Sequence, residues 1–300
     1  MSMGTPISPT PLQTAEHRAY NVVAFSKKNT AIRDCKSLID MSHSASVTAC
    51  LEDISAWMKD HHLQLNPAKT ELLVFPAHPT VQHDFNIHLG NTTITHSKTA
   101  RNLGVIFDEQ LSFNDHIAKT TRSCRYALFK IIKIRPYLTE HAAELLVQAL
   151  VISRLDYCNA LLGGPPAKAM KPLQLVQNAA ARLVFQQPKR AHVTPLFISH
   201  HWLPVAARIS FKSLMLAYRT ITGSAPAYFH TLLHSYTPSR SMRSANQRCL
   251  ELPSHKGSKS LSRSFSFTTP SWWNILPNSV RSTTSLTTFK KLVKTHLFCE

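Results

Sequence analysis

The hydrophobic pattern of this chain changes its period near Asn114, and this change constrains the fold more than any other feature. Between Phe85 and Phe107, apolar residues alternate with polar ones, as in strands that bury one face. From Asn114 onward, apolar residues recur at intervals of three and four, which is typical of amphipathic helices. A strand-rich piece followed by a run of helices predicts the α+β class, with a mostly α-helical second part.

Residues 46–113 are predicted to form one helix and a small, mainly antiparallel sheet. Apolar residues from Val47 to Met58 recur at helical spacing. Gly90-Asn91 favours a hairpin turn between two of the strands that follow. The predicted strands are "ELLVF" (71–75), "FNIHLG" (85–90), "TTITH" (92–96) and "NLGVIFD" (102–108).

Residues 114–235 are predicted to form a helical domain of five or six segments. The first segment ends before Pro136, and Thr139 is placed to cap the second, which stops at "LLGGPP". Further helices are predicted over Ala167–Phe185, from Thr194-Pro195, and over residues 204–223, the last closed by Gly223. The predicted apolar positions of the first two segments are Ile117, Cys124, Leu128, Ile131 and Ile132, and then Leu145, Leu146, Ala149, Leu150 and Leu155.

The two ends of the chain differ from the middle in composition. Residues 1–44 contain clustered prolines and no sustained periodicity, so we expect a poorly ordered leader with a short helix near Asp34–Met41. Residues 236–300 are expected to contain a basic loop, a short strand at "CLELP" (249–253) and a final amphipathic helix.

The charge of the chain points to a polyanionic partner. Lys and Arg number 34 against 16 Asp and Glu, for a formal net charge of +18, and nucleic acid is the first polyanion to consider. The alternative is a basic protein without a partner, or an unselected reading frame. Within residues 238–263, six cations face only Glu251 and are spaced to follow a phosphate backbone. These cations are Arg240, Arg243, Arg248, Lys256, Lys259 and Arg263.

Neither metal-binding nor catalytic patterns stand out. The 17 histidines form no ligand set with metal spacing, and the six cysteines are scattered without a CxxC pair, as in a reducing compartment. Glu52-Asp53, Asp108-Glu109 and Asp156 come nearest to paired carboxylates, but solvated surface positions explain them better. Trp272-Trp273 offers either a stacking platform or a core anchor, and the core is favoured. Without a signal peptide or a membrane span, we expect an intracellular protein in nucleus or cytoplasm.

Several motifs together resemble a known family. They are "CLEDISAWMKDHHLQLNPAKTELLVF", "RNLGVIFDEQLSF", "DYCNALLGG", "QNAAARLVF", "HWLPVAARISFKSLMLAYRTITGSAPAYF" and "SFTTPSWWNILPNSVR". They are similar to the carboxy-terminal part of the reverse transcriptase of LINE-type (non-LTR) retrotransposons, an RNA-directed DNA polymerase. The resemblance covers about residues 46–300. It implies that residues 46–113 are the end of a palm, residues 114–235 a thumb, and residues 236–300 an extension.

The resemblance also implies roles for three residues. Lys69, in "NPAKTELLVF", matches a lysine that helps to protonate the leaving pyrophosphate, and a general acid suits an oxygen that gains negative charge. "RNLGVIFD" is similar to the primer grip, so Arg101 and the turn at Gly104 are expected to contact nucleic acid. The intact family uses Mg²⁺ bound by aspartates of a Tyr-x-Asp-Asp motif.

This chain departs from the family at the catalytic motif. No Tyr-x-Asp-Asp occurs, and Asp34 and Asp40 stand isolated in that region. The expectation is therefore a truncated, catalytically inactive copy without a cofactor, in which Lys69 is the remnant of an incomplete site. We expect weak, non-specific binding of RNA or RNA/DNA duplex. The alternatives are an inert or host-adopted scaffold that binds a protein partner through exposed apolar surface, and a residual polymerase.

Overall fold

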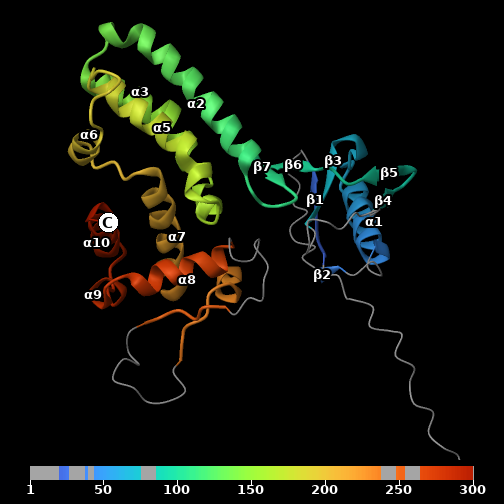
Figure 1. Cartoon of the computed structure of the whole chain (residues 1–300). Helices are drawn as coiled ribbons and strands as arrows, with labels where there is room; N and C mark the ends of the chain where they lie inside the picture. The colour runs from blue at the N-terminus through green and yellow to red at the C-terminus, as the bar shows by residue number, and fades with distance from the viewer. Residues whose placement is uncertain are drawn as a thin grey trace, which may run out of the picture. The chain divides into compact units, whose positions relative to one another are not determined.

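The computed structural model of the chain describes residues 20–26, 38–39, 44–75, 86–237, 248–253 and 264–299 (Figure 1). The chain divides into two compact units. The first comprises residues 1–104 and 108–110, and the second comprises residues 105–107 and 111–300. The first combines a helix with small antiparallel sheets and the second is almost entirely helical, which confirms the predicted α+β class.

The first unit contains one long helix and several short strands. β1 pairs antiparallel with both β2 and β3, so their sheet has the order β2-β1-β3. β4 and β5 form the predicted hairpin around Gly90, whose φ of 57° suits a tight turn. The elements are β1 (Tyr20–Ser26), β2 (Leu38–Ile39), α1 (Ser44–Asp60), η2 (Pro67–Lys69), β3 (Thr70–Phe75), β4 (Asn86–Leu89), β5 (Thr92–Thr95) and β6 (Thr99–Asn102). β6 pairs with β7 (Val105–Asp108), most of which is assigned to the second unit.

An apolar core packs α1 against the strands in the described part of the first unit. One face of α1 packs on the strands because its apolar residues recur at helical spacing, and in β4 the buried Ile87 and Leu89 alternate with the exposed Asn86 and His88. The period-2 prediction for this strand is confirmed. The buried core residues are Val47, Leu51, Met58, Leu65, Leu72, Val74, Ile87, Leu89 and Ile94.

Two strands come from the segment that was expected to be a poorly ordered leader. β1 pairs with the whole length of β3, from Asn21 opposite Phe75 to Ser26 opposite Thr70. The helix predicted near Asp34–Met41 is wrong at Leu38–Ile39, which forms β2. Backbone pairing with β1 overrides the weak local preference there. The other residues of that predicted helix, Asp40 among them, lie outside the described part of the chain.

The second unit is a succession of helices joined by short turns. Its elements are α2 (Asn114–Ile134), η3 (Arg135–Tyr137), α3 (Glu140–Val147), η4 (Gln148–Ile152, a π-helix), α4 (Ser153–Asp156), η5 (Asn159–Gly163), α5 (Ala167–Val184), α6 (Thr194–Ser199), α7 (Val205–Ile221), η6 (Ala227–Thr231), α8 (Phe265–Ile275), α9 (Asn278–Arg281) and α10 (Leu286–Cys299). The predicted boundaries are confirmed where a local signal exists. α2 ends before Pro136, the Ala142 N–H donates to Thr139 Oγ1 at 3.2 Å, and Gly223 follows α7 with a φ of 73°.

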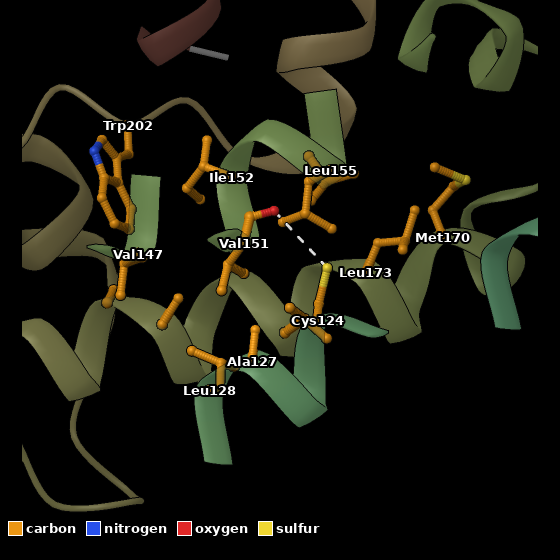
Figure 2. Packing of buried hydrophobic residues seen from close by; sticks show 14 of the residues in the cluster. Cys124, Ala127, Leu128, Val147, Val151, Ile152, Leu155, Met170, Leu173 and Trp202 are labelled. Atoms are coloured by element: carbon orange, nitrogen blue, oxygen red, sulfur yellow. Dashed lines mark hydrogen bonds between the residues drawn. The ribbon is translucent and has the colours of Figure 1, made fainter. Parts of the chain in front are cut away.

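Two hydrophobic clusters fill the second unit. The larger joins α2, α3, η4, α4 and α5, and Figure 2 shows Cys124 of α2 pointing at the Val151 carbonyl, with 3.8 Å between Sγ and O. The other joins α7 to α8, α9 and α10. Its centre holds Trp273 and Phe289, neither of which has any exposed surface.

The buried face of the segment 139–156 differs from the predicted one. Leu145, Ala149 and Leu150 are exposed, whereas Ala143 and Val151 are fully buried. For Ala149 and Leu150 the π-helix explains the difference, because its wider turn shifts the face that the helix presents to the core. In α2, Ile132 was also expected in the core and is 57% exposed.

The carboxy-terminal elements are largely as expected. The amphipathic α10 is confirmed, with Phe289 and Val293 buried. "CLELP" makes only one isolated bridge, between Leu250 and Ser235, instead of a strand. Within the part of the chain that the structure describes, no helix combines the length and the apolar character needed to cross a membrane.

Candidate nucleic-acid interface

Lys69 lies at the end of η2, immediately before β3. Asn66 organises this turn, since its carbonyl accepts hydrogen bonds from the Lys69 N–H and from Thr70 Oγ1, both at 3.0 Å. Pro67 at the start of η2 costs no hydrogen bond there. The Lys69 side chain is exposed, so the turn presents its ammonium group to solvent.

Arg101 and Gly104 lie close to one another in and after β6. The Arg101 N–H donates to Glu71 Oε2 at 3.0 Å, which ties β6 to the start of β3, two residues beyond Lys69. Leu103 and Gly104 have φ of 45° and 87°, so both residues of this turn are left-handed, as a tight two-residue hairpin requires. The structure thus brings Lys69 and Arg101 into one region of the first unit, but with the Glu71 carboxylate beside them.

Only one cation of the predicted basic loop lies in a described segment. Arg248 is exposed, and its carbonyl accepts a hydrogen bond from Trp273 Nε1 at 2.7 Å. The backbone of Arg248 is left-handed, with a φ of 47°, and the hydrogen bond from Trp273 stabilises this turn. Arg240, Arg243, Lys256, Lys259 and Arg263 lie outside the described residues, so the loop prediction stays a prediction.

The two tryptophans are core residues, as the favoured interpretation held. Trp273 is fully buried among α7, α8 and α10. Trp272 is half-buried and packs on Gly163, where an added Cβ would lie 2.9 Å from Trp272 Cη2. A ring packed in this way offers no free face for a base.

The sequence interpretation missed a row of cations on α2. This helix buries one face, and its opposite face carries five exposed cations beyond the first turn. The one acid of the helix is Asp115, in the first turn, where a carboxylate favours the helix amino terminus. We name this surface the α2 basic face, and it consists of Lys119, Arg122, Arg125, Lys130 and Lys133.

Aromatic side chains lie among these cations. Tyr126 and Phe129 are 60% and 55% exposed. Lys130 Nζ lies 4.6 Å from the Tyr126 ring centroid, and Lys133 Nζ lies 4.6 Å from that of Phe129. These cation–π contacts orient the ammonium groups along the ring faces. Tyr137, in η3, is 87% exposed just beyond the helix.

A sixth cation flanks α2 from α4. Arg154 Nη1 donates to Ser123 Oγ at 2.8 Å and to the Ser123 carbonyl at 3.2 Å. This pair of bonds holds a guanidinium beside the middle of the helix. The basic residues of α2 follow one another at spacings of three and five in the sequence, which is compatible with one side of a helix.

Carboxylates form no candidate catalytic pair in the described segments. Glu52 and Asp53 are exposed on α1, and Asp108 Oδ1 accepts the Gln110 N–H at 3.1 Å in a turn. Asp156 is paired with Arg208. Among the residues that the structure describes, no three His, Cys, Asp or Glu side chains gather where a metal ion could be held.

No family model, no curated protein and no solved structure matches this chain.

Proposed function

We propose that this chain is a catalytically inactive, reverse-transcriptase-like protein that binds RNA or RNA/DNA duplex weakly and without sequence preference. The α2 basic face carries the proposal, because it places five exposed cations and two exposed rings on one side of a rigid helix. The motif resemblance and the net charge of +18 agree with it. We expect such a protein in the nucleus or the cytoplasm.

The dimensions of this face suit a nucleic-acid backbone. Lys119 and Lys133 are fourteen residues apart, so the face extends about 21 Å along the helix. That length corresponds to about six nucleotides of one strand at about 3.4 Å each. Each ammonium or guanidinium that meets a phosphate releases a counterion, and the binding energy is therefore expected to come mainly from salt-sensitive contacts.

Fluorescence anisotropy with a labelled RNA/DNA hybrid tests the proposal. We expect micromolar or weaker affinity that falls steeply between low and physiological salt. The variant Arg122→Gln/Lys130→Gln/Lys133→Gln should flatten the slope of log K against log salt by about two to three, at about 0.9 for each lost phosphate contact. The matched control, Lys168→Gln/Lys171→Gln/Lys189→Gln, removes the same charge from exposed positions elsewhere in the second unit.

Two outcomes would contradict the proposal. Absence of binding by the unaltered chain at low salt removes the function altogether. If the control variant and the α2 variant lose the same amount of affinity for the hybrid, binding depends on total charge and not on the α2 basic face.

The proposal includes no catalytic step. Nucleotide transfer needs carboxylates that hold two metal ions, and this chain contains no Tyr-x-Asp-Asp. In a primer-extension assay with magnesium or manganese we expect no product, and a template-dependent product would establish the residual polymerase instead.

A protein-interaction scaffold is the second candidate function. Large apolar side chains are exposed near the carboxyl end of α2, with Ile132 at 57%, Ile134 at 44% and Tyr137 at 87%. Exposed apolar surface of this kind is typical of a protein interface. Salt separates the two functions, because burial of apolar surface resists added salt whereas phosphate contacts do not.

A further inference from the structure

A second group of charged residues lies on α7 and on α4 and α10, each of which packs against α7. Arg208 of α7 donates from Nη1 to Asp156 Oδ2 at 2.7 Å and from Nε to the Leu203 carbonyl at 2.8 Å. Asn159 Nδ2 reaches the other carboxylate oxygen at 3.4 Å. The Arg208 side chain is 16% exposed and that of Asp156 is 41% exposed, so the pair lies at the edge of the core and is open to solvent on one side.

Two lysines join this ion pair. Lys212 follows Arg208 by four residues on α7, so the two side chains share one helical face. α10 packs against α7 and stacks Phe289 on Tyr218, with ring centroids 4.3 Å apart. Lys294 lies five residues further along α10 and is close enough to Arg208 for repulsion to act on it.

The charges in this group do not balance. Burial, and next the repulsion from Arg208, lower the pKa of Lys294. Burial raises the pKa of Asp156 more than the attraction of Arg208 and Lys212 lowers it. Among the described residues, neither Lys212 nor Lys294 has a carboxylate in ion-pair contact. Asp156 attracts Arg208 and Lys212, and Lys294 is near Arg208, so the group contains three cations and one carboxylate, with an excess of two positive charges.

We propose that Arg208, Lys212 and Lys294 form a binding site for a phosphate group. A phosphate group carries about one negative charge in a nucleic-acid backbone and about 1.5 to 2 in a monoester at neutral pH, so the excess positive charge attracts it. The guanidinium of Arg208, oriented by two other hydrogen bonds, supplies directed donors, and Lys212 and Lys294 add positive charge near it. The phosphate can be a free one, such as pyrophosphate, or part of a nucleic-acid backbone. The site does not depend on nucleic-acid binding by α2.

Reductive methylation of lysines, resolved by mass spectrometry, tests the site on the full chain. The neutral amine is the reactive form, so an anion that raises the Lys294 pKa by about one unit slows its labelling about tenfold. We expect pyrophosphate to slow Lys294 and Lys212, while the exposed Lys189 stays unchanged at matched ionic strength. The same labelling rates are then measured with a short RNA without terminal phosphates in place of pyrophosphate.

The two arms distinguish the source of the phosphate. Protection by pyrophosphate alone identifies a site for free phosphate, and protection by RNA alone identifies a backbone contact. The proposal is overturned if neither pyrophosphate nor RNA slows the methylation of Lys294, or if Lys189 is slowed to the same extent. RNA binding through α2 can fail without affecting the pyrophosphate arm, so the two proposals fail separately.

Two variants separate the phosphate site from a purely structural ion pair. Lys294→Gln should abolish the protection of Lys212 by pyrophosphate, whereas Lys189→Gln should leave it intact. Asp156→Asn removes the competing carboxylate, and half-maximal protection should then need severalfold less pyrophosphate. Unchanged protection in both Lys294→Gln and Asp156→Asn contradicts a phosphate site and leaves Asp156 and Arg208 as a structural pair only.

Discussion

Arg135, which follows α2, caps the carboxyl end of α5 at Val184. Its Nη2 donates to the Val184 carbonyl at 2.6 Å, its Nε to the Leu183 carbonyl at 3.0 Å, and its Nη1 to the Leu138 carbonyl at 2.8 Å. The side chain is 8% exposed. One cation thereby satisfies carbonyls that α5 cannot pair within its last turn, and it lies at the negative end of that helix dipole.

Arg135→Lys should destabilise the protein even though the charge is retained. An ammonium group cannot reach three carbonyls in this fork geometry, and buried carbonyls left unpaired cost about 1–3 kcal/mol each. We expect a loss of about 2–4 kcal/mol in urea unfolding. Arg125→Lys, the same change at an exposed position of α2, should stay within about 0.5 kcal/mol of the unaltered chain. Equal effects of the two substitutions would show that the cap contributes nothing.

Cys124 should be the slowest of the described cysteines to react with alkylating agents. Burial raises the pKa of its thiol to about 11, and the nearby Arg154 lowers it by a smaller amount. The thiolate is the reactive form, so iodoacetamide at pH 8 should label the exposed Cys299 long before Cys124. Peptide mass spectrometry measures both rates, and comparable labelling in the folded protein contradicts the burial.

The same thiol makes stability depend on pH in alkaline solution. The folded pKa of about 11 lies above the ordinary value of 9.0, so the folded chain holds a proton that the unfolded chain releases. The contribution is fully present below about pH 9 and is lost as the pH rises towards 11. Cys124→Ala should remove this part of the pH dependence, as followed by urea midpoints.

Gly163→Ala should destabilise the second unit. An added Cβ would lie 2.9 Å from Trp272 Cη2 and 3.4 Å from Cζ3, so the indole ring has to move. Overpacking of this kind costs about 1–3 kcal/mol. In a Trp272→Leu background, Gly163→Ala should lower the free energy of unfolding by a smaller amount, because the opposing indole ring is absent. A cost that is independent of residue 272 rules out this contact as the cause.

Trp273→Phe should weaken the fold and leave nucleic-acid binding unchanged. The substitution removes the hydrogen bond from Nε1 to the Arg248 carbonyl and leaves a void in a fully buried position, for a loss of about 2–4 kcal/mol. At a temperature where the variant remains folded, its affinity for the RNA/DNA hybrid should equal that of the unaltered chain. Weaker binding by the folded variant would restore the stacking interpretation of this tryptophan.

The sequence by itself determined several helix boundaries of the second unit and the buried face of one strand of the first unit. These boundaries depend on the backbone or side-chain chemistry of single residues, namely Pro136, Thr139 and Gly223. Each acts within a few residues, so its effect can be predicted without knowledge of the fold. The alternation that places Ile87 and Leu89 on one face of β4 is local in the same way.

Only the tertiary structure decided which faces are covered. Periodicity shows that residues share a face, but what covers that face depends on segments far away in the chain. The pairing of β1 with β3 and the burial of Trp273 arise in this way. The π-helix at Gln148–Ile152 placed Val151 in the core where Leu150 was expected, and no local pattern in the sequence predicted that π-helix. On α2, the packing of one side against α3 and α5 leaves the cations and rings of the other side exposed, and that free surface carries the proposed function.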